Sequence, residues 1–105
     1  MGRLGSGKIM KPVILKLARN DLNEIYEYLS GFGKDSPGKF RMSFERFCEQ
    51  VADMPCMFSQ YEHNQNYRKS VIAFGYLIFY KSEENGQIRI YRVLHGRRNT
   101  EPLLE

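Results

Sequence analysis

The hydrophobic pattern of the chain changes its period near residue 66, and this change limits the folds that the chain can adopt. Before it, apolar residues recur at intervals of three and four, as on one face of a helix. These residues are Leu22, Ile25, Leu29, Phe40, Phe44, Phe47 and Val51. After it, apolar and aromatic residues form short runs typical of strands. The sequence therefore predicts two helices followed by strands, with the two apolar stripes buried against a sheet.

The two helices are predicted at residues 20–31 and 36–54. Asn20 is expected to cap the first helix, and Gly31 or Gly33 to end it in a left-handed conformation. Ser36 and Pro37 are typical of the start of the second helix, which Met54 and Pro55 close. The short glycine-containing turn between them predicts an antiparallel helical hairpin.

Strands are predicted at residues 12–18, 67–72, 74–81 and 87–95, with a loop at residues 55–66. A tight connection at residues 73–75 and a hairpin turn at Asn85-Gly86 predict that the last three strands form an antiparallel meander. The fold class is therefore α+β, with one mostly antiparallel sheet. We expect the helices to cover one face of the strand at residues 74–81 and the other face to be partly aromatic and open, with a bulge near Val93 able to change which residues face outward.

The composition, 105 residues of which 42% are hydrophobic, is sufficient for a single small domain, predicted over residues 11–99. Residues 1–10 are interpreted as a flexible arm or an expression remnant, and residues 100–105 as a loosely docked tail. The net charge is +4, with basic ends around an acidic middle, which suits a negatively charged partner. Two cysteines and two histidines without metal-ligand spacing predict no metal and no cofactor, and the absence of a long apolar run predicts a cytoplasmic protein without a membrane span.

A cationic cluster follows the last predicted strand. Residues 89–98 contain Arg89, Arg92, His95, Arg97 and Arg98, and residues 87–100 contain no carboxylate. Such a cluster is either a functional surface that binds a target or a solvated strand end whose arginine side chains cover apolar surface.

Within this cluster the residues are expected to differ in role. Gly96 can turn the chain sharply, so that Arg97 and Arg98 project toward a target. Arg92 lies inside the strand and is expected to pair with a carboxylate or to stack on Tyr80 or Tyr76. His95 can either orient the turn through a backbone hydrogen bond or move protons.

The order and spacing of several motifs resemble the RelE/ParE superfamily of bacterial toxins, and most closely its ParE, or plasmid-stabilisation, branch. The resemblance covers residues 13–99. It rests on Asp21-Leu22-x-x-Ile25-Tyr26-x-Tyr28-Leu29, Pro55, Arg68, Tyr76-x-Ile78-x-Tyr80 and above all Arg92-Val93-Leu94-His95-Gly96-Arg97-Arg98. Asn99 departs from the Asp found in many ParE-like chains.

The resemblance implies a toxin of a type II toxin–antitoxin pair that poisons DNA gyrase and forms a hetero-oligomer with an acidic, ParD-like antitoxin. Target-binding residues are then Arg97, Arg98, His95 and Arg92. Antitoxin-binding residues are Arg68, Tyr76 and Tyr80. The antitoxin is expected to be an extended segment that folds on binding.

Two other functions remain open. The RelE-like branch consists of ribosome-dependent ribonucleases that cut mRNA, and for that activity the candidate catalytic residues are His95, Arg68, Arg92 and Tyr80. The lysines typical of such sites have no convincing match, because Lys69 and Lys81 are the only lysines on the strands predicted after residue 66, which favours gyrase poisoning. The third possibility is a non-toxic domain whose basic face binds only its antitoxin or nucleic acid.

Overall fold

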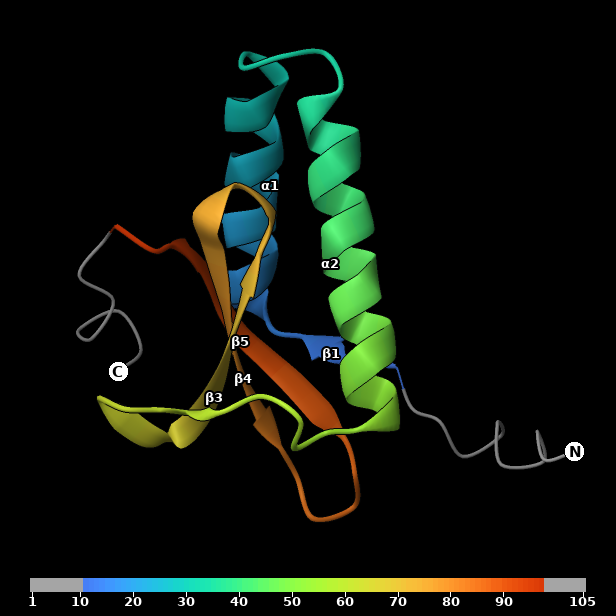
Figure 1. The fold of residues 1–105 in the computed structure, drawn as a ribbon, viewed down its shortest axis with the longest axis vertical. Helices are drawn as coiled ribbons and strands as arrows, with labels where there is room; N and C mark the ends of the chain where they lie inside the picture. The colour runs from blue at the N-terminus through green and yellow to red at the C-terminus, as the bar shows by residue number, and fades with distance from the viewer. Residues whose placement is uncertain (1–10, 98–105) are drawn as a thin grey trace, which may run out of the picture.

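The structure is a computed structural model that describes residues 11–97. Two antiparallel helices stand side by side and pack against one face of a sheet (Figure 1). The elements are β1 (Val13–Ile14), α1 (Lys16–Ser30), α2 (Ser36–Asp53), β2 (Gln60–Tyr61), β3 (Asn64–Ile72), the 3-10 turn η2 (Ala73–Gly75), β4 (Tyr76–Ser82) and β5 (Ile88–His95). The predicted arm at residues 1–10 and tail at residues 100–105 lie outside the described residues, as do Arg98 and Asn99.

The sheet has the strand order β1-β5-β4-β3-β2. Strands β2 to β5 pair antiparallel, whereas β1 pairs parallel with β5. The predicted α+β class, helical hairpin and three-stranded meander are therefore confirmed.

The first predicted strand, residues 12–18, is wrong in its extent. Only Val13 and Ile14 form a strand, and the amide of Leu15 donates to the carbonyl of Ile90 at 3.0 Å before α1 begins at Lys16. Residues 16–19, Lys-Leu-Ala-Arg, are good helix formers, and Ala18 is buried in line with Leu22. The helix consequently starts four residues before the predicted cap at Asn20.

The predicted ends of the helices need smaller corrections. Gly31 caps α1 with φ −89°, in the right-handed region, so no left-handed glycine stops the helix. Its amide donates to the Tyr28 carbonyl, which tightens the last turn enough to end it. Ser36 is the first residue of α2 rather than its cap, a position that Asp35 occupies.

The predicted loop at residues 55–66 contains the short strand β2 and the start of β3. Gln60 faces Arg68 and Tyr61 faces Asn64, and the amide of Asn66 donates to Oδ1 of Asn64 at the start of β3. The segment has no hydrophobic alternation because most of its side chains are exposed at the sheet edge, although Tyr61 is buried and packs against Phe79.

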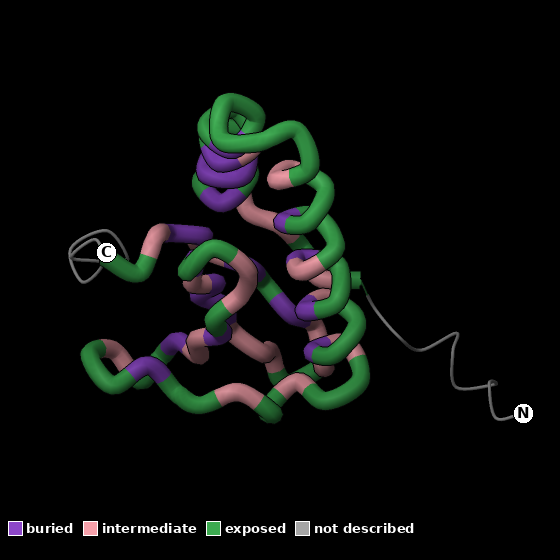
Figure 2. The backbone as a smooth tube through the Cα atoms, turned by 45° about the horizontal axis from the view of Figure 1, so that its top comes forward, coloured by how far each residue is buried: buried purple, intermediate pink, exposed green. Residues whose placement is uncertain are grey.

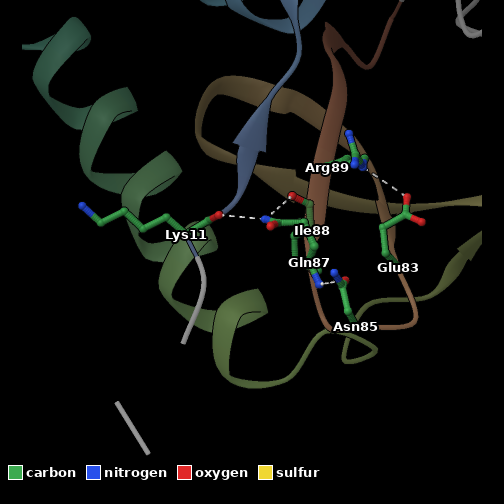
Figure 3. A network of polar contacts seen from close by, with 6 residues as sticks. All are labelled: Lys11, Glu83, Asn85, Gln87, Ile88 and Arg89. Carbon is green, nitrogen blue, oxygen red and sulfur yellow. Dashed lines mark hydrogen bonds and ion pairs between the residues drawn. The ribbon is translucent and has the colours of Figure 1, made fainter. Parts of the chain in front are cut away.

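The hairpin turn at Asn85-Gly86 is confirmed, with Gly86 at φ 87°. Figure 3 shows how this end of the sheet is held. Oδ1 of Asn85 accepts from the amide of Gln87 at 2.9 Å, and Nε2 of Gln87 donates to the carbonyl of Lys11 at 3.0 Å. Gln87 therefore ties the residues before β1 to the start of β5.

A bulge at Tyr91 decides which side chains of β5 face the helices. Phe79 faces Arg92 whereas the next residue, Tyr80, faces Ile90, so Tyr91 is the extra residue. Before it, Ile88 and Ile90 pack on the helices, and after it Val93 does. The predicted possibility of a bulge is borne out, two residues before the expected place.

The main core lies between the sheet and the helices, where buried positions line the inner sides (Figure 2). All seven residues of the two predicted apolar stripes are buried. A smaller cluster lies on the opposite face of the sheet and contains Tyr61, Tyr67, Phe79 and Leu94. The predicted open face is thus aromatic, and its own side chains bury part of it.

Candidate partner-binding site

The carboxylate of Asp21 holds the end of β5 against α1. Arg92 donates to it twice, from Nε to Oδ2 at 2.8 Å and from Nη2 to Oδ1 at 2.9 Å, and the amide of Val93 donates to Oδ2 at 3.0 Å. β1 is too short to pair with this part of β5, so Asp21 supplies the acceptor that a longer strand would have provided.

This contact explains the state of Arg92. The hydrogen bonds that Arg92 donates to Asp21 raise the pKa of its guanidinium above the ordinary value. The expected pairing of Arg92 with a carboxylate is therefore confirmed, and its side chain is only 16% exposed. Sequence analysis named Asp21 only as part of the family motif and missed this partnership.

His95 orients the turn that follows β5. Its Nδ1 accepts a hydrogen bond from the amide of Arg97 at 3.2 Å. The ring also contacts Tyr76 edge to face, with centroids 5.1 Å apart. Of the two roles expected for His95, the structure shows the backbone contact.

Gly96 lets its backbone approach that of Gly75 closely, and it does not have an unusual backbone angle. Its amide donates to the carbonyl of Gly75 at 2.9 Å, and a Cβ added at residue 96 would lie 3.1 Å from that oxygen. Gly75 follows Phe74, a non-glycine residue with φ 62°. The tight turn predicted at residues 73–75 therefore packs directly against the segment that carries Arg97.

These elements enclose a groove of about 480 Å³ between α1 and the end of β5. Its walls include Glu24, Tyr28, Phe32, Phe74, His95 and Arg97. Tyr28 and Phe32 are 61% and 64% exposed although their rings lie 5.7 Å apart. The groove is thus an accessible aromatic surface with one arginine at its rim.

Sequence reasoning did not assign Tyr28, Phe32 or Phe74 to a site. A signal was present, because Tyr28 in the last turn of α1 and Phe32 just after the end of that helix are two aromatic residues four positions apart. Two aromatic residues that neither predicted apolar stripe includes can mark an accessible apolar surface.

Of the predicted site residues, the groove brings together Tyr76, His95 and Arg97, with Arg92 beside them on Asp21. Arg68 and Tyr80 lie elsewhere: they face each other across β3 and β4. Nη1 of Arg68 donates to the carbonyl of Phe58 at 2.7 Å. Arg98 lies outside the described residues.

Tyr80 is a core residue. Its side chain is fully buried, and its hydroxyl donates to the carbonyl of Pro55 at 3.2 Å. Burial raises the pKa of Tyr80 from its ordinary value of 10 to about 12, although the nearby Arg68 opposes the shift. The Tyr80 phenol is therefore neutral at physiological pH, and its hydroxyl is already used in the hydrogen bond to Pro55.

Residues 11–97 offer few other groups that could bind a metal or act as a nucleophile. Within that range no three His, Cys, Asp or Glu side chains come together as a metal site would require. Burial raises the pKa of the Cys48 thiol to about 11, so it is not a thiolate nucleophile at neutral pH. None of the helices in this range is long and apolar enough to cross a membrane.

The fold and the groove define a small α+β domain of the RelE/ParE superfamily, whose accessible apolar surface suits a protein partner. Residues 13–100 match the family model of the ParE toxin of type II toxin–antitoxin systems (parDE), and the chain therefore belongs to the ParE toxin family. A comparison with curated proteins gave no match. Membership implies an antitoxin as partner.

Proposed function

We propose that this toxin poisons DNA gyrase in the cytoplasm and that the Arg97 turn contacts the target. We favour gyrase over RNA as the target because the side chains that a nuclease would need already form contacts within the chain. Nδ1 of His95 accepts from the amide of Arg97, the Tyr80 hydroxyl is buried on Pro55, and Arg92 is tied to Asp21. RNA cleavage requires an accessible base and acid, whereas binding to a protein target requires only an exposed surface.

The target-binding surface is proposed to comprise Arg97, Arg98, His95 and Arg92. Arg97 is exposed, whereas Arg92 and His95 hold the turn that presents it. Replacing Arg97 and Arg98 together with alanine should abolish growth arrest while circular dichroism stays unchanged. The matched control is Arg41→Ala with Arg46→Ala, two exposed arginines of α2 with the same loss of charge.

His95→Gln separates the two targets. If gyrase is the target, this variant should reduce toxicity only modestly, and cells should form filaments with a DNA-damage response. If it is instead among the most damaging changes, and translation stops with truncated messages, the chain is a ribonuclease, because loss of a general acid or base commonly costs about 10²–10⁴-fold in rate. Inhibition of DNA supercoiling by purified gyrase gives the direct measurement.

We further propose that the antitoxin places an amphipathic segment in the groove. Tyr28, Phe32 and Phe74 offer apolar contact, and Arg97 at the rim can meet a carboxylate. Such a segment folds as it binds, so the affinity should depend more on buried area than on charge. The predicted antitoxin residue Tyr76 lies in this groove, whereas Arg68 and Tyr80 would have to act from the far end of β3 and β4.

Tyr28→Ala with Phe32→Ala should weaken the complex with the antitoxin, which the adjacent open reading frame should encode as a small acidic protein. Met42→Ala, another exposed apolar residue on the helical hairpin, is the control and should leave affinity unchanged. Raising salt from about 0.1 M to about 1 M screens exposed charge pairs. A complex abolished by that change would contradict the apolar part of the proposal.

A further inference from the structure

The face of the sheet opposite the helices carries a row of three cations, Lys69, Lys81 and Arg89. Lys69 lies opposite Phe79, and Lys81 lies opposite Arg89. Residues opposite each other on paired strands share a face, and a residue two positions further along is a diagonal neighbour. The three side chains therefore start from adjacent positions on β3, β4 and β5.

Tyrosine rings fix the positions of the two lysine ammonium groups. Nζ of Lys81 lies 4.7 Å from the ring centroid of Tyr67 and 4.9 Å from that of Tyr91. Nζ of Lys69 lies 5.5 Å from the ring centroid of Tyr61. The negative faces of these rings attract the ammonium groups, which are thereby ordered before any ligand binds.

The row lacks matching negative charge within residues 11–97. Arg89 has a carboxylate, that of Glu83, at 3.4 Å (Figure 3), but neither lysine forms an ion pair there. Like charges directly opposite on neighbouring strands are destabilising. An anionic partner would relieve this repulsion, so the electrostatics favour a ligand that carries negative charge.

The surface next to the cations is apolar. Val71 lies opposite Leu77 on the same face, further along β3 and β4, and its side chain is 66% exposed. A ligand that fits both the row of cations and the apolar surface has negative groups at one end and apolar groups at the other. Single-stranded nucleic acid fits less well, because it needs accessible aromatic faces for base stacking, and Tyr61 and Tyr67 are buried with ammonium groups over their rings.

We propose that this face, defined by Lys69, Lys81, Val71 and Leu77, binds an extended acidic segment of a partner protein. Carboxylates of the segment pair with Lys69 and Lys81, and its apolar side chains cover Val71 and Leu77. The surface is separate from the groove at α1, and its existence does not depend on the choice of gyrase as target.

The test uses a short synthetic peptide in which glutamate alternates with valine, labelled for fluorescence anisotropy and titrated with the full chain. A second peptide with glutamine in place of glutamate should not bind. Lys69→Gln with Lys81→Gln should weaken binding of the first peptide by about tenfold, as expected for the loss of two exposed ion pairs. Lys39→Gln, an exposed lysine of α2, should leave it unchanged.

Lys81→Arg keeps a cation over the two tyrosine rings and should preserve binding. This variant tests the need for a cation at position 81 even if the double lysine variant fails to fold. Equal loss of binding in Lys39→Gln, or no loss in the double lysine variant, would overturn the proposal. Tighter binding of a short oligothymidylate than of the acidic peptide would assign the face to nucleic acid instead. Concentration-dependent dimerisation that the double lysine variant abolishes would assign it to a second copy of the chain.

Discussion

The two faces of the sheet bury their apolar side chains by different means. On one face, α1 and α2 form a second layer over Ile78, Tyr80 and Ile90. On the other, none of the helices within residues 11–97 covers Phe79, and its burial comes from neighbours in the sheet such as Tyr61, whose ring meets it edge to face at 5.0 Å. A covered face can be wholly apolar, whereas an uncovered face needs long polar side chains, here lysines, to meet the solvent.

The difference bears on function. The helix-covered face contributes to stability, and its edge, where α1 meets the end of β5, forms the groove and presents Arg97. The uncovered face keeps its polar and charged groups accessible, and these are the groups that a second partner segment could use. Four substitutions test this contrast.

The largest loss is expected on the covered face. Phe47→Ala should lower the free energy of unfolding by about 3–5 kcal/mol, because a fully enclosed ring is replaced by a cavity. That is a large part of the roughly 5–15 kcal/mol available to a small domain. Chemical denaturation measures it, and Met42→Ala, exposed on the same helix, should change it by less than about 0.5 kcal/mol. A similar loss in both variants would mean that α2 does not cover this face.

The next loss is expected at the edge between the faces. Asp21→Asn should cost about 1.5–3 kcal/mol, since Arg92 keeps its charge and loses the carboxylate that accepts its two hydrogen bonds. Thermal unfolding measures the change. Glu27→Gln, at an exposed position of the same helix, serves as the control. An unchanged Asp21→Asn variant would show that the end of β5 does not depend on α1.

A smaller loss, with a pH signature, is expected for the hydroxyl of Tyr80. Tyr80→Phe should cost about 0.5–1.5 kcal/mol at neutral pH, the net value of one hydrogen bond. The folded-state pKa of about 12 lies above the ordinary value of 10, so the neutral phenol favours the folded state fully below pH 10. This contribution is lost as the pH rises from 10 to 12.

Stability of the parent chain should therefore fall more steeply over that interval than stability of Tyr80→Phe. Denaturation at several alkaline pH values measures the two slopes. Tyr28→Phe, at an exposed position, should retain the parent slope. Identical slopes for all three proteins would place the Tyr80 phenol in contact with solvent.

The smallest loss is expected on the uncovered face. Lys81→Gln should cost about 0.5–1 kcal/mol, because the ammonium group over Tyr67 and Tyr91 is removed. Lys39→Gln has the same change of charge without such rings and should be neutral. A loss as large as that of Phe47→Ala would mean that this face holds a core equivalent to the covered one.

Several features follow from the amino-acid sequence by itself, because local periodicity and turn chemistry encode them. The apolar stripes of α1 and α2 require a layer to cover, the runs after residue 66 require strands, and Asn85-Gly86 requires a tight hairpin. The motif from Arg92 to Arg98 by itself indicates the family. These signals depend on residues close together in the chain.

Only the tertiary structure decided the details of the site. Whether residues 15–19 extend a strand or start a helix depends on how far β5 offers a pairing edge, although Lys-Leu-Ala-Arg favours a helix. The bulge at Tyr91 sets which side chains of β5 face the helices, and the contact of Asp21 with Arg92 joins residues 71 positions apart. Such choices depend on packing between distant segments, which local periodicity does not specify.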